Sequence, residues 1–520
     1  MYGKIALGLA IVLLVLRFTV YPVVVYFVDR KGFRRYPNMS LFSGVSNIPF
    51  MIEARRGFRS KHLAELHQKH PVIRIGPNSL SYGDVRAIKM STQDIYGHST
   101  KCTKDDFYDL LSGSHYHLAD VIDKGEHQRK RKVLSSAYAI KNLEGWEYKV
   151  ADKVGRLVKK FDQHSAPPQE GPIDSSCTVD WRAWSNFFTM DAIADIGLSA
   201  SLGFLDQGDD MTTSETLDGT TSRVSYRDCL HSQLTALSQL VWAYKWHKSL
   251  CKWFRRLSLK QGKLLDKGDG FDGIVLHQAR QRLQRYQKGE KLDDFFQALM
   301  ESKDGAPNHL PFGEIVAEIS IMMNAGSVST AVAINNAMLL LARHQPILSK
   351  LREEIDAVAD SDEIAISYDK IKDLPYLRAC LDESMRVLPP TPFGLPRKTP
   401  PEGCQVFGQW VPGNTTVSMS AYVAHRDESV FPDPEVFRPE RWLGEEGKQL
   451  QPYFITFSAG ARGCIGRNIS YLEQTILLAS VIHRYDVELE SPDFEQSWYE
   501  HFNMVPGPLP LRIRRRQHEA

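Results

Sequence analysis

Apolar residues recur at helical spacing through most of the chain, and short β-like runs lie on either side of that region. The run from Val72 to Ile75 has the pattern of a strand and is closed by the turn sequence Gly-Pro-Asn. From about residue 126 to 390 the pattern is mostly helical, as in 347–358. Charged or glycine-rich interruptions near 206–222, 266–273 and 302–309 are too short to be domain linkers. After Pro389 proline, glycine and short β-branched runs dominate. This order predicts one large, mainly α-helical domain with small β-sheets.

The N-terminal stretch from Ile5 to Val28 is almost entirely apolar, with one charge at Arg17. As a helix it spans about 36 Å, enough for a hydrocarbon core of about 30 Å. Arg30, Lys31, Arg34 and Arg35 follow, and the positive-inside rule then keeps the main body cytoplasmic. We therefore expect a membrane anchor with a basic flank at 1–35 and a globular domain at 36–520. A cleaved signal peptide and a buried core helix are the alternatives.

Composition narrows the class of protein. The 520 residues carry 64 basic and 62 acidic side chains, a net charge of +2. That balance offers no whole-molecule field for nucleic acid, and the short basic run at 512–516 is weak evidence for it. Seven scattered cysteines with no CxxC pair fit neither a disulfide framework nor a structural zinc site. They fit reduced thiols in the cytosol.

One cysteine stands in a distinctive setting. Cys464 lies among Gly460, Gly463 and Gly466, which let the backbone turn tightly and approach a flat ligand. An apolar run compatible with a helix begins at Ile469. A thiolate at the start of a helix is stabilised by the helix dipole and has a lowered pKa. These are properties of a metal-ligating sulfur, although a buried, inert cysteine in a glycine-rich turn is the alternative.

This segment resembles the haem-binding loop of the cytochrome P-450 monooxygenases, FxxGxRxCxG. It matches every fixed position of that loop: Phe457, Gly460, Arg462, Cys464 and Gly466. The resemblance implies the cytochrome P-450 fold, preceded here by one transmembrane helix, and a haem b cofactor. It also implies that Cys464 is the axial iron ligand, that Phe457 packs beside the sulfur and that Arg462 pairs with a haem propionate.

Further matches occur in the family's order. Glu383 and Arg386 are spaced to share one face of a helix, and by resemblance they form a buried structural pair that Arg441 joins. His127 and Arg131 stand where the family has WxxxR, and both side chains can donate to a propionate. Arg397 matches another propionate contact.

A long apolar stretch, 311–344, predicts a helix through the domain interior. In its middle, Ala325 and Gly326 match the family pattern (A/G)Gx(D/E)T, whereas Val328 replaces the acid and Ser329 replaces the threonine, with Thr330 following. By resemblance, this acid and hydroxyl help to deliver protons to oxygen. Three hypotheses remain open: Ser329 with ordered water, assisted by Thr330, forms the relay; coupling is reduced or the chemistry needs no O–O cleavage; or a carboxylate from another element serves.

The resemblance implies a monooxygenase that uses O2 and electrons from NADPH, with NADPH–cytochrome reductase as partner and cytochrome b5 as a further candidate. The anchor and the family together place it in the endoplasmic reticulum membrane. Arg129, Lys130 and Lys132 are candidates for steering the reductase. Aromatic and basic residues alternate from Trp242 to Arg256, as at a membrane interface.

The substrate pocket can be sketched by resemblance only. It includes the segment 96–118 and the residues Ala325, Ser329, Phe393, Leu395, Phe502 and Met504. This mixture suits a lipophilic or aromatic small molecule. Fungal microsomal members, including the benzoate para-hydroxylase type, are the most similar, which points to secondary metabolism. A catabolic hydroxylase of aromatic acids and a haem-thiolate isomerase or dehydratase without a reductase are the alternatives.

Overall fold

The computed structural model describes the chain except residues 1–4, 6–7, 10–11, 14, 86–94, 136, 139–143, 169–170, 303 and 518–520. Its helices are α2 (Tyr21–Val28), α3 (Ile48–Arg56), α4 (Arg59–His67), α6 (Phe107–Leu111), α7 (Lys124–Ser135), α9 (Glu147–His164), α10 (Trp181–Leu198), α11 (Phe204–Gln207), α12 (Tyr226–Leu240), α13 (His247–Arg256), α14 (Lys260–Gln287), α15 (Phe295–Met300), α16 (Phe312–Arg343), α17 (Gln345–Asp356), α18 (Tyr368–Ile371), α19 (Pro375–Val387), α20 (Ala421–Ala424), α21 (Gly444–Leu450) and α22 (Arg467–Arg484).

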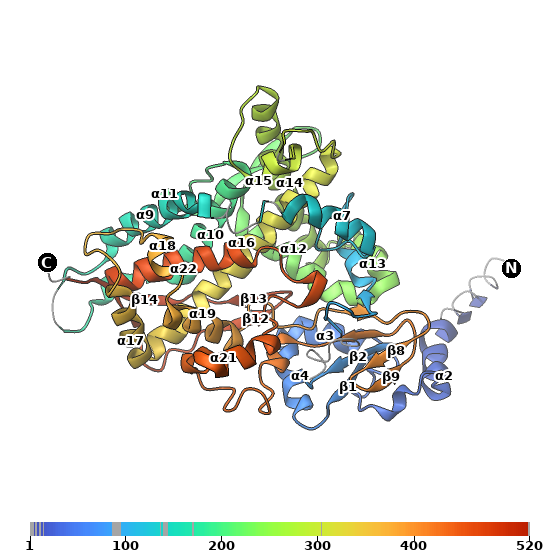
Figure 1. The fold of residues 1–520 in the computed structure, drawn as a ribbon. Helices are drawn as coiled ribbons and strands as arrows, with labels where there is room; N and C mark the ends of the chain where they lie inside the picture. The colour runs from blue at the N-terminus through green and yellow to red at the C-terminus, as the bar shows by residue number, and fades with distance from the viewer. Residues whose placement is uncertain are drawn as a thin grey trace.

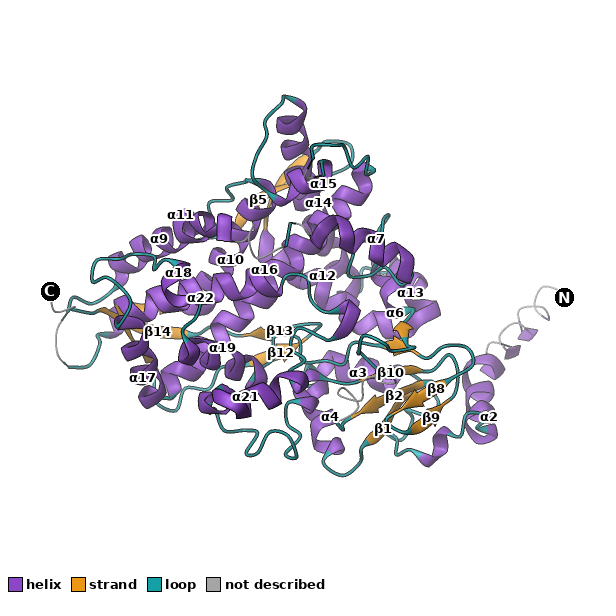
Figure 2. Cartoon of the chain, in the orientation of Figure 1, coloured by secondary structure: helices purple, strands orange, loops and turns teal. Residues whose placement is uncertain are grey.

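The strands are short and lie mostly near the two ends of the chain. They are β1 (Val72–Gly76), β2 (Ser79–Tyr82), β3 (Thr103–Lys104), β4 (Thr178–Asp180), β5 (Met211–Glu215), β6 (Thr221–Ser225), β7 (Arg397–Lys398), β8 (Cys404–Val406), β9 (Gln409–Val411), β10 (Thr416–Ser418), β11 (Tyr485–Leu489), β12 (Trp498–Glu500), β13 (Met504–Pro506) and β14 (Pro510–Arg515). The mainly helical architecture with small sheets confirms the predicted fold class (Figure 2).

The largest sheet joins segments that are far apart in the sequence. Its strand order is β1-β2-β10-β7-β3, and β10 runs parallel to β2 while the other pairs are antiparallel. The register of β3 with β7 places Lys104 opposite Arg397. The sheet lies beside α3 and α4, away from the sheet formed by β11, β14 and β4 (Figures 1 and 2). The pairing of β3 with β7 thereby brings Lys104 and Arg397, which are far apart in the sequence, close together.

Helix α16 crosses the middle of the helical body (Figure 1). It begins after Pro311 and ends before Pro346, as the apolar stretch predicted, and it packs against α10, α19 and α22. Most of its residues are buried, because it is apolar on nearly all sides. Helix α22 follows Cys464 directly and is buried along almost its whole length. These two helices frame the space in which Cys464 lies.

Among the described residues, α16 is the one helix long and apolar enough to cross a membrane, and 83% of its most apolar window is buried inside the protein. It is therefore a core helix. The predicted anchor falls partly outside the described residues. Its second half, Leu16–Val28, is helical, and most of its apolar side chains are exposed. Phe18 of this helix contacts Trp246, with ring centroids 5.1 Å apart.

Candidate active site

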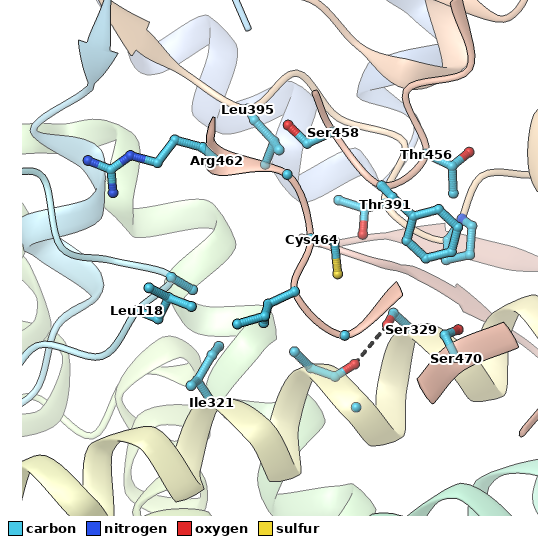
Figure 3. Close-up of a pocket in the computed structure, with 18 of the residues that line it drawn as sticks. Leu118, Ile321, Ser329, Thr391, Leu395, Thr456, Ser458, Arg462, Cys464 and Ser470 are labelled. Carbon is cyan, nitrogen blue, oxygen red and sulfur yellow. Dashed lines mark hydrogen bonds between the residues drawn. The ribbon is translucent and has the colours of Figure 1, made fainter. Parts of the chain in front are cut away.

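A cavity of about 380 Å³ lies between α16, the loop 455–466 and the segment around Leu118. Its wall is mainly apolar, with Leu118, Ile321 and Leu395 among its residues (Figure 3). Most of the predicted site residues line it: Ala325, Ser329, Thr330, His127, Arg131, Phe393, Leu395, Arg397, Phe457, Arg462 and Cys464. Residues predicted from four separate parts of the sequence thus meet in one cavity.

The loop that carries Cys464 is built by local backbone geometry. Gly460 has φ +67°, and a Cβ there would lie 2.3 Å from the Tyr96 carbonyl oxygen, so only glycine fits. The Cys464 N–H donates to the Phe457 carbonyl at 2.8 Å and closes the loop. The Cys464 sulfur faces the cavity (Figure 3), and its exposed surface is open to that internal space. Among the described cysteines, Cys464 alone lines the cavity.

Two opposing effects act on the pKa of the Cys464 thiol. Burial raises the pKa of the Cys464 thiol, while the backbone N–H groups of Gly466 and Arg467 act in the opposite direction. These N–H groups belong to the start of α22, where the helix dipole favours negative charge. A soft sulfur ligand with backbone donors aimed at it is typical of a metal-bound thiolate, in which such donors moderate the charge on sulfur.

Cationic side chains surround one side of the cavity and bond to neutral groups. Arg131 donates to the Gly463 carbonyl at 2.8 Å, Arg397 to the Tyr108 hydroxyl at 3.0 Å, and Arg462 to the Val121 carbonyl at 2.8 Å. No salt bridge within the described part of the chain gives Arg131, Arg397, Arg462 or Lys104 a carboxylate partner. Burial, and secondarily Arg397, lowers the pKa of Arg462 to about 10. This cluster of buried and half-buried cations, without a carboxylate partner among the described residues, fits the two propionates of a haem.

His127 lies on the same helix face as Arg131, as its spacing predicted, and lines the cavity while otherwise buried. Burial, followed by the charge of Arg462, lowers its pKa to about 3, so the ring is neutral at physiological pH. A neutral imidazole keeps one N–H donor and adds no further charge to the cationic cluster.

Behind the cysteine loop, the predicted structural pair is buried and fully engaged. Arg386 binds the Glu383 carboxylate through two hydrogen bonds, of 2.8 and 2.9 Å, and Arg441 adds a third of 3.0 Å. Trp442 donates to the same carboxylate at 2.8 Å. All three charged side chains have no exposed surface. The network links α19 to the segment 438–442, and Thr456 of the loop before Cys464 donates to the Met385 carbonyl of α19 at 3.2 Å.

On α16 the two hydroxyls differ in their partners. Ser329 faces the cavity and donates to the Ala325 carbonyl at 2.7 Å (Figure 3). Thr330 also reaches the cavity, but its hydroxyl donates to Ser470 of α22 at 3.0 Å and is buried. Gly326 packs against α10, because a Cβ there would lie 2.7 Å from Ile193. Val328 points to the opposite side of the helix, into a small space lined also by Arg182 and His231.

The structure corrects part of the predicted pocket. Phe502 and Met504 are not among the residues that line the cavity, whereas Asn503 between them is. Phe502 packs against Phe107 and Phe393, and Met504 is buried in β13. Of the predicted segment 96–118, the cavity is lined by Tyr96, Lys104, Tyr108 and Leu118. Asn503 lies in the connection between β12 and β13, just before β13 begins.

Sequence reasoning missed Glu318, the one carboxylic acid among the described residues that line the cavity. It accepts a hydrogen bond from Lys130 at 3.1 Å and another from the Leu118 N–H at 3.2 Å.

Lys130 also binds Glu314 at 2.7 Å and is only 4% exposed. The expectation that Lys130 faces a reductase is therefore wrong, because the register of α7 turns it toward α16. A charged residue inside an apolar stretch was the available signal for Glu318.

The comparisons with known proteins agree with this geometry. A family model for cytochrome P-450 matches residues 51–512. The chain belongs to the cytochrome P-450 family. It is 28% identical to benzoate 4-monooxygenase bphA of Aspergillus niger, over 94% of each chain. It is 30% identical to cytochrome P-450 monooxygenase atr2 of Stereocaulon alpinum, over 92% of this chain and 89% of the relative.

Tryprostatin B 6-hydroxylase of Aspergillus fumigatus is 27% identical, over 91% of this chain and 79% of the relative. A crystal structure of another cytochrome P-450 superposes with a TM-score of 0.71 at 19% identity and covers 92% of this chain and 99% of its own. The protein is accordingly a cytochrome P-450 monooxygenase that acts on small molecules, with haem held by a cysteine thiolate. The predicted family, fold, enzyme class and cofactor are confirmed.

Proposed function

We propose that this cytochrome P-450 hydroxylates or otherwise oxidises a lipophilic or aromatic small molecule in fungal secondary metabolism, with electrons from NADPH through a membrane-bound reductase. The observation that carries the proposal is the position of Cys464, whose sulfur faces a largely apolar cavity beside a cluster of unpaired cations. Haem bound there supplies the activation of O2. The relatives support the substrate class, since their names include hydroxylases of benzoate and of tryprostatin B.

Each protein group has a distinct role in this proposal. Cys464 would ligate the iron, and Phe457 of the same loop would pack beside the sulfur. Arg131, Arg397 and Arg462, with His127, hold the propionates. Ser329 would bind water in the cavity through lone pairs that its bond to Ala325 leaves available. Thr330 serves a different purpose, because its bond to Ser470 ties α16 to α22.

The polar groups on the opposite wall suggest how a substrate is oriented. Thr391 donates to the Asn503 side-chain oxygen at 3.2 Å, and both residues line the cavity. This bond directs the Asn503 amide N–H groups away from Thr391 and leaves them as donors. A substrate with a carbonyl or carboxylate acceptor on an apolar or aromatic frame fits this wall. Aromatic acids and polyketides therefore belong in the same substrate screen.

Membrane attachment of residues 1–35 with a cytosolic domain at 36–520 is part of the proposal. The contact between Phe18 and Trp246 brings the N-terminal helix to the segment before α13. On that side Trp253 is 67% exposed, and Ile48 and Ile52 of α3 are exposed as well. Exposed tryptophan and aliphatic side chains beside lysine and arginine suit a bilayer interface. An endoplasmic reticulum location follows from this anchor.

The decisive experiment combines spectroscopy with turnover. Reduced, carbon monoxide-treated protein should give the strongly red-shifted Soret band of a haem thiolate, and Cys464→Ser should abolish it. Cys380→Ser is the matched control, because Cys380 is buried and does not line the cavity. Spin-state shifts then identify ligands, which are tested for oxidation with NADPH, reductase and O2. Turnover of the true substrate without O2 or reductase would instead support an isomerase or dehydratase.

A further inference from the structure

A second cavity, of about 400 Å³, lies apart from the haem cavity, between α3, α12, α14 and β12. Arg55 of α3 and Lys260 at the start of α14 both line it. Within the part of the chain that the structure describes, neither has a salt bridge or a side-chain hydrogen bond. The acids closest in sequence on the same elements already have cationic partners: Glu53 binds Arg56 at 2.8 Å, Glu500 binds Arg59 at 2.8 Å, and Asp266 binds Arg255. Among the described residues, these two lining cations thus have no ion-pair partner.

The first turn of α14 adds to this positive potential. The helix has 28 residues and starts at Lys260 with no acidic residue in its first turn and no side-chain cap. The N-terminal N–H groups of a long helix carry a partial positive charge. Two cations and an uncapped helix start therefore converge on one cavity, which favours an anion.

The interior of the cavity offers neutral hydrogen-bonding groups without partners. Gln239 of α12 is 8% exposed, lines the cavity, and makes no side-chain hydrogen bond to any described residue. His501 is also 8% exposed; its Nε2 lies 3.0 Å from the Thr235 hydroxyl, and its Nδ1 has no partner. An amide at a cavity wall without a protein partner can donate to a bound ligand. Gln239 and His501 therefore offer hydrogen-bonding groups to a polar ligand in this cavity.

The surroundings of the cavity are apolar. Ile52 lies one turn before Arg55 on α3, and Leu257 and Leu259 lie just before Lys260; all three are exposed. Helices α3 and α13 both contact the segment Val241–Trp246, whose Trp246 meets the N-terminal helix, and α2, α3 and α13 lie toward the same end of the molecule (Figure 1). An apolar rim combined with cations and hydrogen-bond donors matches the boundary between acyl chains and headgroups.

We propose that this cavity binds the phosphate headgroup of an anionic phospholipid from the membrane to which the protein is anchored. The phosphate lies between Arg55 and Lys260, Gln239 donates from inside, and the exposed aliphatic residues contact the acyl chains. The proposal rests on the membrane attachment proposed above. It adds a lipid-specific site that is separate from the substrate cavity.

The test uses the haem-loaded full chain in a nonionic detergent, titrated calorimetrically with dihexanoyl phosphatidylserine below its micelle concentration. We expect saturable binding of one lipid per chain, with dihexanoyl phosphatidylcholine at least about tenfold weaker. The double variant Arg55→Gln/Lys260→Gln should lose at least about tenfold in affinity. Gln239→Leu, which leaves the charge unchanged, should lose several-fold.

The matched control is Arg56→Gln/Lys263→Gln, which removes the same charge from the same two helices outside the cavity lining. It should stay within about twofold of the native affinity. If both double variants lost the same affinity for phosphatidylserine, the lipid would be held by the overall positive charge of this surface, and the proposed site would be overturned. Equal binding of phosphatidylcholine, or displacement of the lipid by equimolar inorganic phosphate, would overturn the anionic-lipid assignment.

Correct folding of each variant is checked by its unchanged carbon monoxide spectrum. Membrane attachment itself is tested separately, by flotation of the full chain with vesicles of pure phosphatidylcholine. Flotation without selective phosphatidylserine binding would reject the lipid site and leave the anchor standing. Selective binding without flotation would reject the anchor and reassign the site to soluble anionic amphiphiles, which overturns the proposal as stated.

Discussion

The hydroxyl of Ser329 donates a hydrogen bond to the carbonyl oxygen of Ala325, one turn earlier on α16, at 2.7 Å. Both residues face the haem cavity, and Gly326 between them lets α10 pack closely through Ile193. A serine bonded back to its own helix weakens the backbone hydrogen bond at that carbonyl. Because its proton is committed to Ala325, the Ser329 oxygen can only accept from water.

Replacement of Ser329 by alanine removes that acceptor. We expect product formed per NADPH consumed to fall at least about tenfold, because proton delivery depends on ordered water at this point. Substrate affinity should change little, and Ser329→Thr should restore coupling. Coupling is measured as the amount of product formed per NADPH oxidised, and hydrogen peroxide is measured beside it as the uncoupled fraction. Unchanged coupling in Ser329→Ala would show that the relay passes elsewhere, with Glu318 as the first group to test.

Val328 occupies the position of the family's acid but lies on the side of α16 turned toward Arg182 and His231. Burial lowers the pKa of Arg182 to about 10, and its guanidinium donates to the Pro506 carbonyl at 3.1 Å. An aspartate at 328 would gain a cationic partner in Arg182. Although this position faces away from the cavity, by resemblance the family's acid passes protons toward the neighbouring hydroxyl, here Ser329, so we expect Val328→Asp to raise the fraction of NADPH electrons that appear in product. Val328→Asn is the uncharged control, and near-complete coupling in the native enzyme would refute an impaired relay.

The sequence was sufficient for features that local spacing encodes. Helix α16 matches the predicted stretch 311–344 to within one residue at each end, because a run that is apolar on all sides has few alternatives. The glycines around Cys464 also indicated, from the sequence, a tight loop that could bring this cysteine close to a flat ligand. The hairpin of β5 and β6 was missed, although Asp218-Gly219 at its turn is a known hairpin signal.

Other features depend on tertiary contacts that one sequence does not encode locally. The glycine-rich stretch 266–273 looked like an interruption, yet it lies within α14. Gly268 packs against the Gln233 backbone and Gly273 against Ser214, so the glycines permit close approach rather than end the helix. Likewise, the inward turn of Lys130 depends on Glu318, almost two hundred residues away. Asn503 likewise lines the cavity together with Thr391, which lies more than a hundred residues earlier and donates to its side-chain oxygen.

Arg131 and Lys132 are adjacent on α7 and provide a matched pair. Arg131 faces the cavity and donates to the Gly463 carbonyl at 2.8 Å, whereas Lys132 is exposed. Arg131→Gln should lower haem retention about tenfold, because a charge-assisted bond to a propionate is lost. Lys132→Gln should retain haem fully. Haem transfer to apomyoglobin measures the release rate, and equal rates for the two variants would remove Arg131 from the propionate site.

Acid sensitivity should follow from buried histidines. His425 has no exposed surface, stacks on Phe454 with ring centroids 5.4 Å apart, and accepts from the Ile455 N–H at 3.1 Å. Burial, followed by the charges of Arg386 and Arg426, lowers its pKa to about 3. Burial also lowers the pKa of five further histidines: His67, His117, His127, His231 and His501.

The sign of the effect follows from proton linkage. The unfolded chain binds a proton at His425 near pH 6.5 and the folded chain only near pH 3, so stability is lost as pH falls through that window. At pH 5 the loss is about 2 kcal/mol for this ring. His425→Gln keeps an acceptor for Ile455 but cannot titrate, so its unfolding free energy should fall less between pH 7.5 and 5. The exposed His164→Gln is the control. Denaturant unfolding followed by the carbon monoxide spectrum measures each slope, and an unchanged slope in His425→Gln would contradict the assignment of a neutral buried ring.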